Sequence, residues 1–164
     1  MRRPDLVLGV GHPDRGDDAL GHRLVAHLEG RLPGVEVVAH HGEGLGLIAL
    51  WEDRQTVVLV DAAQSGAAPG TLHRLDSADG SLLNPLAGRL FATNSHAFGV
   101  AQAIHTAAVL KRLPGRLVVL AVEAADLTLG HGLSAPVAAM MPPLAEAVAT
   151  ALGQSLKPAM GGGR

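Results

Sequence analysis

Three polar side chains stand where apolar segments of this sequence begin or end. Asp18 closes a loop rich in Gly, Pro and Asp, Asp61 follows the β-branched run 56–60, and His96 lies at the start of a helix-like segment. An α/β fold can bring all three to one edge of a sheet, because ligand sites in open sheets gather where parallel strands end. Two carboxylates and one imidazole at that edge would form a mixed oxygen and nitrogen metal site.

Each of these residues also has an ordinary structural explanation. Aspartate is favoured at helix starts, but two adjacent carboxylates are more than capping requires, so we expect Asp17 to cap and Asp18 to face a cleft. Asp61 can simply end a strand through local hydrogen bonds to backbone. His96 stands near a helix N-terminus, which disfavours the imidazolium and helps to keep a neutral ring that can bind a metal.

The other histidines carry weaker signals. His22 and His27 do not share one face of the first expected helix, and His105 lies inside another helix, so structural or exposed roles are expected for them. The pair His40-His41 differs, because it ends a strand and leads into Gly42-Glu43-Gly44. We regard this pair as a candidate lining of the same cleft.

Composition indicates one compact domain and excludes several classes of function. The chain has 164 residues, of which 48% are hydrophobic, and a formal charge of -2 from interspersed charges. Such a balance argues against nucleic-acid binding, and 2% aromatic residues leave little for base stacking. Without cysteine there is no disulfide, thiolate zinc site or thiol nucleophile. No apolar run approaches the roughly 18 residues of a membrane span, so we expect a cytoplasmic protein without membrane insertion.

Alternating strand-like and helix-like segments predict a single-domain, three-layer α/β/α sandwich with a mostly parallel central sheet. The expected strands are 6–10, 35–39, 56–60, 71–75 at an edge, and 116–122. The expected helices are 17–32, 45–51, 95–112 and 134–152, the last interrupted or restarted at Pro142-Pro143. The region 76–90 carries no clear signal. We expect residues 1–156 to form the domain and residues 157–164 to be a flexible C-terminal tail.

Familiar cofactor and protease motifs are incomplete in this sequence. Gly9-Val10-Gly11 follows a strand, but the third glycine of a dinucleotide fingerprint is replaced by Asp14, whose carboxylate would repel phosphate. A tight turn, with no cofactor-binding role, is therefore the preferred interpretation. Neither a Gly-x-Ser-x-Gly elbow nor a His-Glu-x-x-His helix is present, which weakens serine hydrolase and ordinary zinc protease readings.

Taken together, the motifs resemble those of the nickel-iron hydrogenase maturation endopeptidases. The shared pattern is, in order, Gly9 to Asp18 with Gly21, Asp61 followed by Pro69-Gly70, Ser95-His96, and Gly130 to Ser134. It runs through most of the chain and omits the C-terminal tail and the segment between Asp76 and Leu90. The resemblance implies that Asp18, Asp61 and His96 are the catalytic residues and jointly bind the metal.

The resemblance also implies a reaction. A cytoplasmic, aspartic-type endopeptidase removes a short C-terminal extension from the large-subunit precursor of a hydrogenase. In this family, the cleavage follows insertion of the nickel-iron centre. Nickel is then expected to come with the substrate, although other divalent cations can occupy the site. The ion would either polarise the scissile carbonyl or activate water, and both roles stay open. Asp17 and Glu43 are candidate helpers, and a monomer is the favoured oligomeric state.

The sequence departs from the family pattern at several positions, so two alternative functions are also considered. His12 replaces the usual Asn, Ala19 replaces the usual Gly, and His41-Gly42-Glu43-Gly44 stands where many relatives have a sequence like Asp-Gly-Gly-Thr. That loop is associated with substrate recognition, so the hydrogenase isoform is left undetermined. The alternatives are a non-catalytic assembly factor that binds the nickel-loaded precursor, and a small metal-dependent amide hydrolase with another substrate.

Overall fold

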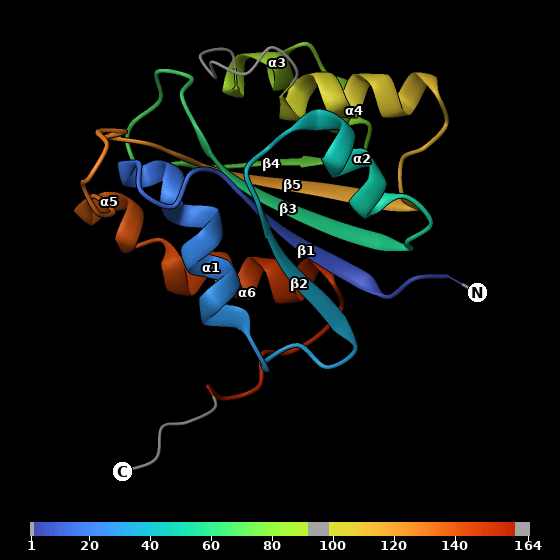
Figure 1. Ribbon diagram of the computed structural model, residues 1–164, viewed down its shortest axis with the longest axis horizontal. Helices are drawn as coiled ribbons and strands as arrows, with labels where there is room; N and C mark the ends of the chain where they lie inside the picture. Colours follow the sequence, from blue (N-terminus) through green and yellow to red (C-terminus); the bar gives the residue numbers. More distant parts are fainter. Residues whose placement is uncertain (1, 92–98, 160–164) are drawn as a thin grey trace.

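A five-stranded sheet with helices on both faces organises the molecule (Figure 1). The computed structural model describes residues 2–91 and 99–159. The strands are β1 (Asp5–Val10), β2 (Val35–His40), β3 (Thr56–Ala63), β4 (Leu72–Asp76) and β5 (Arg116–Glu123), in the order β2-β1-β3-β5-β4. All neighbouring pairs are parallel except β4 and β5. The predicted α/β sandwich with a mostly parallel sheet and an edge strand near 71–75 is confirmed.

Helices cover the two faces of the sheet unequally. One face carries α1 (Leu20–Leu28), the short α5 (Ala135–Ala138) and α6 (Met141–Ala151), and the other carries α2 (Gly44–Trp51), α3 (Leu86–Leu90) and α4 (Val100–Val109) (Figure 1). Two single turns of 3-10 helix, η1 (Gly16–Ala19) and η2 (Ser81–Leu83), complete the described elements. None of the described helices is long and apolar enough to cross a membrane.

The three central strands β1, β3 and β5 are largely apolar on both sides because both faces of the sheet are covered. Leu6, Leu8, Val57 and Leu59 pack on the side of α2 and α4, and Val7, Val58, Val118 and Leu120 pack on the side of α1 and α6. Successive residues of a strand point to opposite faces, so a continuous apolar run fills two cores at once. This explains why the predicted strands were runs rather than alternating patterns.

Several predicted boundaries were wrong. Helix α1 ends at Leu28 and not at Leu32, because Glu29 leaves the helical conformation with a ψ of 127° and Gly30 adopts a φ of 74°, a left-handed conformation that suits glycine. Region 76–90 contains η2 and α3, which are too short to show a helical period. The predicted helix start at Ser95 lies outside the described residues. The predicted restart at Pro142-Pro143 is confirmed, since both prolines lie in the first turn of α6, where a missing N–H is harmless.

Glycines allow β1 and α1 to approach each other closely enough to place η1 over the end of β1. A Cβ atom at Gly9 would clash with the backbone carbonyl of Gly21, and a Cβ atom at Gly21 would meet the backbone of Val10. The contact is backbone against backbone, so no side chain can move aside. The position of η1, and with it Asp18, therefore depends on these two glycines.

Gly9→Ala is expected to lower the free energy of unfolding by about 2–3 kcal/mol, the upper range for overpacking a well-packed site. Urea denaturation followed by circular dichroism measures this change. Gly88→Ala is the matched control, because no atom lies within 4 Å of its added Cβ and residue 88 is helical. Equal unfolding midpoints for Gly9→Ala and wild type would contradict the close approach.

Candidate active site

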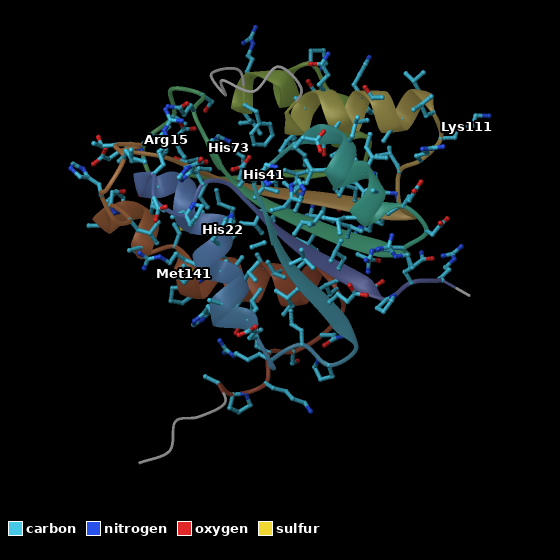
Figure 2. The ribbon with its side chains drawn as sticks, viewed as in Figure 1. Arg15, His22, His41, His73, Lys111 and Met141 are labelled. Atoms are coloured by element: carbon cyan, nitrogen blue, oxygen red, sulfur yellow. The ribbon has the colours of Figure 1, made fainter. Side chains whose placement is uncertain are left out.

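Asp18 and Asp61 line one pocket of about 100 Å³ at the carboxyl edge of the sheet. Asp18 comes from η1, Asp61 from β3, and the wall is completed by His12, Arg15 and His41 together with glycine and valine residues around them. Figure 2 shows Arg15 and His41 on the side of the molecule where β1 and β2 end. The expected meeting of the two carboxylates is observed, and their roles as ligands and catalytic groups remain predictions. His96, the third predicted member, lies outside the described residues.

Asp61 sits inside a strand and not in a turn after it, which corrects the sequence interpretation. Strand β3 continues to Ala63, and Asp61 pairs in register with Ala121 of β5. Its side chain is 2% exposed, and Oδ1 accepts a hydrogen bond of 2.7 Å from the Ala62 N–H. A carboxylate in the core is costly unless something compensates its charge.

Burial shifts both carboxyl groups toward the protonated form. It raises the pKa of Asp18, although the backbone N–H of His12 and the cation of Arg15 act against this shift. It also raises the pKa of Asp61 well above the ordinary value, and the negative charge of Asp18 adds to the effect. A buried carboxylate and a half-buried one that repel each other can share one proton or hold a cation between them. The pocket is therefore suited either to a proton shared by the two carboxyl groups or to a bound cation.

A divalent cation fits the chemistry of this donor set. Each aspartate keeps a carboxylate oxygen that no described donor occupies, since His12 donates to Oδ2 of Asp18 at 3.0 Å and Ala62 donates to Oδ1 of Asp61. Among the described residues, no group of three or more acidic, histidine or cysteine side chains is arranged to hold an ion. A complete site therefore needs a further ligand, for which His96 remains the predicted candidate, or a ligand from the substrate.

Asp17 is a structural anchor and not the helix cap that the sequence suggested. It is fully buried and accepts four hydrogen bonds, from the N–H groups of Ala125, Asp126 and Ser134 and from the Ser134 hydroxyl, at 2.7–3.0 Å. No side chain caps η1. Asp17 thus attaches the motif that ends at Ser134 to η1, and leaves Asp18 as the pocket-facing member of the pair.

Asp17→Ala is expected to destabilise the fold by about 3 kcal/mol or more, because each buried donor left without a partner costs about 1–3 kcal/mol. Thermal melting and urea unfolding measure the loss. Asp14→Ala is the control, since Asp14 is exposed and its side chain makes no hydrogen bond within the described residues. Its expected change is within about 0.5 kcal/mol. Equal stability of the two variants would contradict the anchoring role.

The other candidate residues either line the pocket or have structural roles outside it. Of the pair His40-His41, expected to line the cleft, only His41 is among the residues that line the pocket. His22 has a structural role, because its Nε2 lies 2.8 Å from the Gly11 carbonyl and 3.3 Å from the His40 carbonyl, joining the ends of β1 and β2. Glu43 is exposed and caps α2 by accepting from two backbone N–H groups at 2.8 Å, which explains this carboxylate without a place in the pocket.

Sequence reasoning assigned no role to Arg15, although it lies in the same Gly9-to-Asp18 motif as the carboxylate. The structure places it in the pocket wall, where its charge acts on Asp18. The available signal was its position three residues before Asp18. His12 had been noticed only as a departure from the family pattern, and it too lies in the wall.

Comparison with known proteins decides the family. A model of the hydrogenase maturation protease family matches residues 22–151. The chain belongs to this family. The hydrogenase 2 maturation protease of Escherichia coli (strain K12) is 31% identical to this protease over 156 residues, which cover 92% of this chain and 91% of that protein.

Solved structures agree with the assignment. The hydrogenase maturating endopeptidase HybD from E. coli has a TM-score of 0.75 to this protease at 30% identity, with 93% of each chain covered. An E. coli endopeptidase solved in solution has a TM-score of 0.77 at 29% identity, covering 96% of this chain and 98% of its own. A hydrogenase 2 maturation peptidase from Thaumarchaeota archaeon SCGC_AB-539-E09 has a TM-score of 0.67 at 25% identity. The predicted family resemblance is confirmed, and the protein is an endopeptidase of hydrogenase maturation.

Proposed function

We propose that this protease removes the C-terminal extension from the nickel-loaded large subunit of a nickel-iron hydrogenase precursor. The observation that carries the proposal is the pair of Asp18, which is half-buried, and Asp61, which is buried, two mutually repelling carboxylates in one pocket of a maturation protease. Nickel in the precursor is part of the substrate, and its positive charge compensates the repulsion. The protease would therefore bind a precursor that contains nickel more tightly than one that lacks it.

The chain's own residues would hold and orient the substrate. Asp18 and Asp61 each have one oxygen engaged by a backbone N–H, so each carboxylate is fixed, and its other oxygen accepts no hydrogen bond from a described residue. His96 is proposed as the third ligand. When bound, nickel supplies Lewis-acid chemistry, either on the scissile carbonyl or on a water molecule.

The size of the pocket favours a protein substrate over a small amide. Sites for small molecules have volumes of about 300–1,000 Å³ and enclose most of their ligand. The pocket of this protease measures about 100 Å³. It has room for an ion and one peptide group, while the rest of the substrate must remain outside. This argues against the alternative of a small metal-dependent amide hydrolase.

The test is incubation of the purified protease with a nickel-loaded precursor, followed by mass spectrometry of the large subunit. We expect a new C-terminus and a released peptide. A known family member serves as the positive control, and short unrelated peptides are expected to stay intact. An uncut precursor that binds the protease would favour the assembly factor instead, and cleavage of the unrelated peptides would favour the general hydrolase.

A further inference from the structure

Within the described part of the chain, His41 differs from His12, the other histidine in the pocket wall, because neither of its ring nitrogens makes a hydrogen bond. No hydrogen bond connects its ring to the described part of the chain, and the residue is exposed at the pocket. The Nδ1 atom of His12, in contrast, accepts a hydrogen bond of 3.1 Å from the Asp14 N–H. His12 can donate through Nε2 but cannot accept a proton at Nδ1 without losing that bond. His41 can both accept and donate.

The neighbouring His40 provides a platform that holds the His41 ring. The two rings stack with centroids 4.7 Å apart and planes 12° apart. Nδ1 of His40 accepts a hydrogen bond of 2.9 Å from the Gly42 N–H, which fixes the orientation of the His40 ring. A Cβ at Gly46 would lie 2.7 Å from Nε2 of His40, so the first turn of α2 makes room for the ring.

Of the two rings, His40 is the one disfavoured for taking up a proton. Burial, followed by the neighbouring His41, lowers the pKa of His40 and keeps it neutral. Among the described residues, the charged and titratable groups around His41 are His40 and Glu43 on its own segment. His12, Arg15 and Asp18, from the segment between β1 and α1, and Asp61, from β3, line the same pocket.

We propose that His41 is a catalytic residue that carries the proton from the attacking water to the leaving amine. Water oxygen bonds to the scissile carbonyl carbon while one water proton moves to a ring nitrogen of His41. The carbon–nitrogen bond then breaks, and the same imidazole gives its proton to the departing nitrogen. The products are a carboxyl group on the large subunit and an amine on the released peptide, and His41 ends as it began. The role rests on the proposed function.

His41→Gln in the full-length protease tests the proposal. In single-turnover cleavage of the nickel-loaded precursor we expect the rate to fall about 10²–10⁴-fold, the usual contribution of a general acid–base. We also expect the imidazole limb of the pH–rate profile to disappear while the Kd for the precursor changes little. His27→Gln, an exposed histidine on α1, is the matched control and should behave as wild type. His41→Gly is expected to regain activity when imidazole is added.

Two results overturn the role. One is an unchanged rate in His41→Gln. The other is a weaker Kd with an unchanged pH profile and no rescue by imidazole, which would make His41 a binding residue. Circular dichroism checks that the variants fold, as expected for an exposed side chain. If wild type cuts the precursor and His41→Gln cuts it equally, only this role fails. If wild type leaves it intact, the proposed function fails and the role fails with it.

Discussion

Replacing Asp61 by asparagine is expected to stop processing of the nickel-loaded precursor and to raise the melting temperature of the protease. Asparagine has the shape of aspartate and can still accept the Ala62 N–H at Oδ1, but it lacks the charge that a cation requires. We expect the cleavage rate to fall by about 10²–10³-fold or more, the loss typical of removing one electrostatic group from an active site.

The gain in stability follows from the raised pKa of Asp61. Burial and the charge of Asp18 make the folded state bind the Asp61 proton more tightly than the unfolded state does. Ionisation of Asp61 therefore costs stability. The cost is absent below the unfolded pKa of about 3.9 and grows as the pH rises through the higher folded pKa. At neutral pH the amide avoids it, and we expect a gain of about 0.5–2 kcal/mol.

Thermal melting at several pH values and single-turnover cleavage measure the two effects. Asp14→Asn is the control, because Asp14 is exposed and outside the pocket wall, and it should change neither quantity. The stabilisation of Asp61→Asn should shrink as the pH falls. Full activity of Asp61→Asn would remove Asp61 from the site, and an unchanged melting temperature at neutral pH would contradict the repulsion between the two carboxylates.

A precursor that carries the C-terminal extension but no nickel is expected to remain uncut. Without the cation, Asp18 and Asp61 repel each other. Ionised carboxylates are acceptors only, so this pair cannot bind the scissile carbonyl, which is also an acceptor. We expect cleavage to slow by about 10²-fold or more, in keeping with the several kcal/mol that a metal ion contributes to such reactions.

Mass spectrometry of nickel-free and nickel-loaded samples of one precursor measures this dependence. Loading the nickel-free sample in vitro and repeating the assay provides the control, because the polypeptide is then identical. Equal cleavage of both samples would show that cleavage does not depend on nickel in the precursor. The two carboxylates would then act as a pair that shares a proton, as their raised pKa values also permit.

Local sequence was enough to predict the fold class and to single out Asp18 and Asp61, which the structure brings into one pocket. Runs such as 56–60 are continuous and apolar, which is typical of strands buried on both faces, and carboxylates interrupt such runs only at a cost that suggests function. The family motifs depend on residue types at short spacing, so they too were visible in the sequence. Boundaries failed where short elements such as η2 and α3 show no period.

Only the tertiary structure decided which side chains face the pocket. Asp17 and Asp18 are adjacent and chemically alike, yet Asp17 is turned inward by Ser134, 117 residues away, while Asp18 faces Asp61. The extension of β3 past Asp61 likewise depends on pairing with β5, and the place of Arg15 and His41 in the wall depends on how three strand ends meet. Orientation is set by partners distant in the chain, and local patterns carry no information about them.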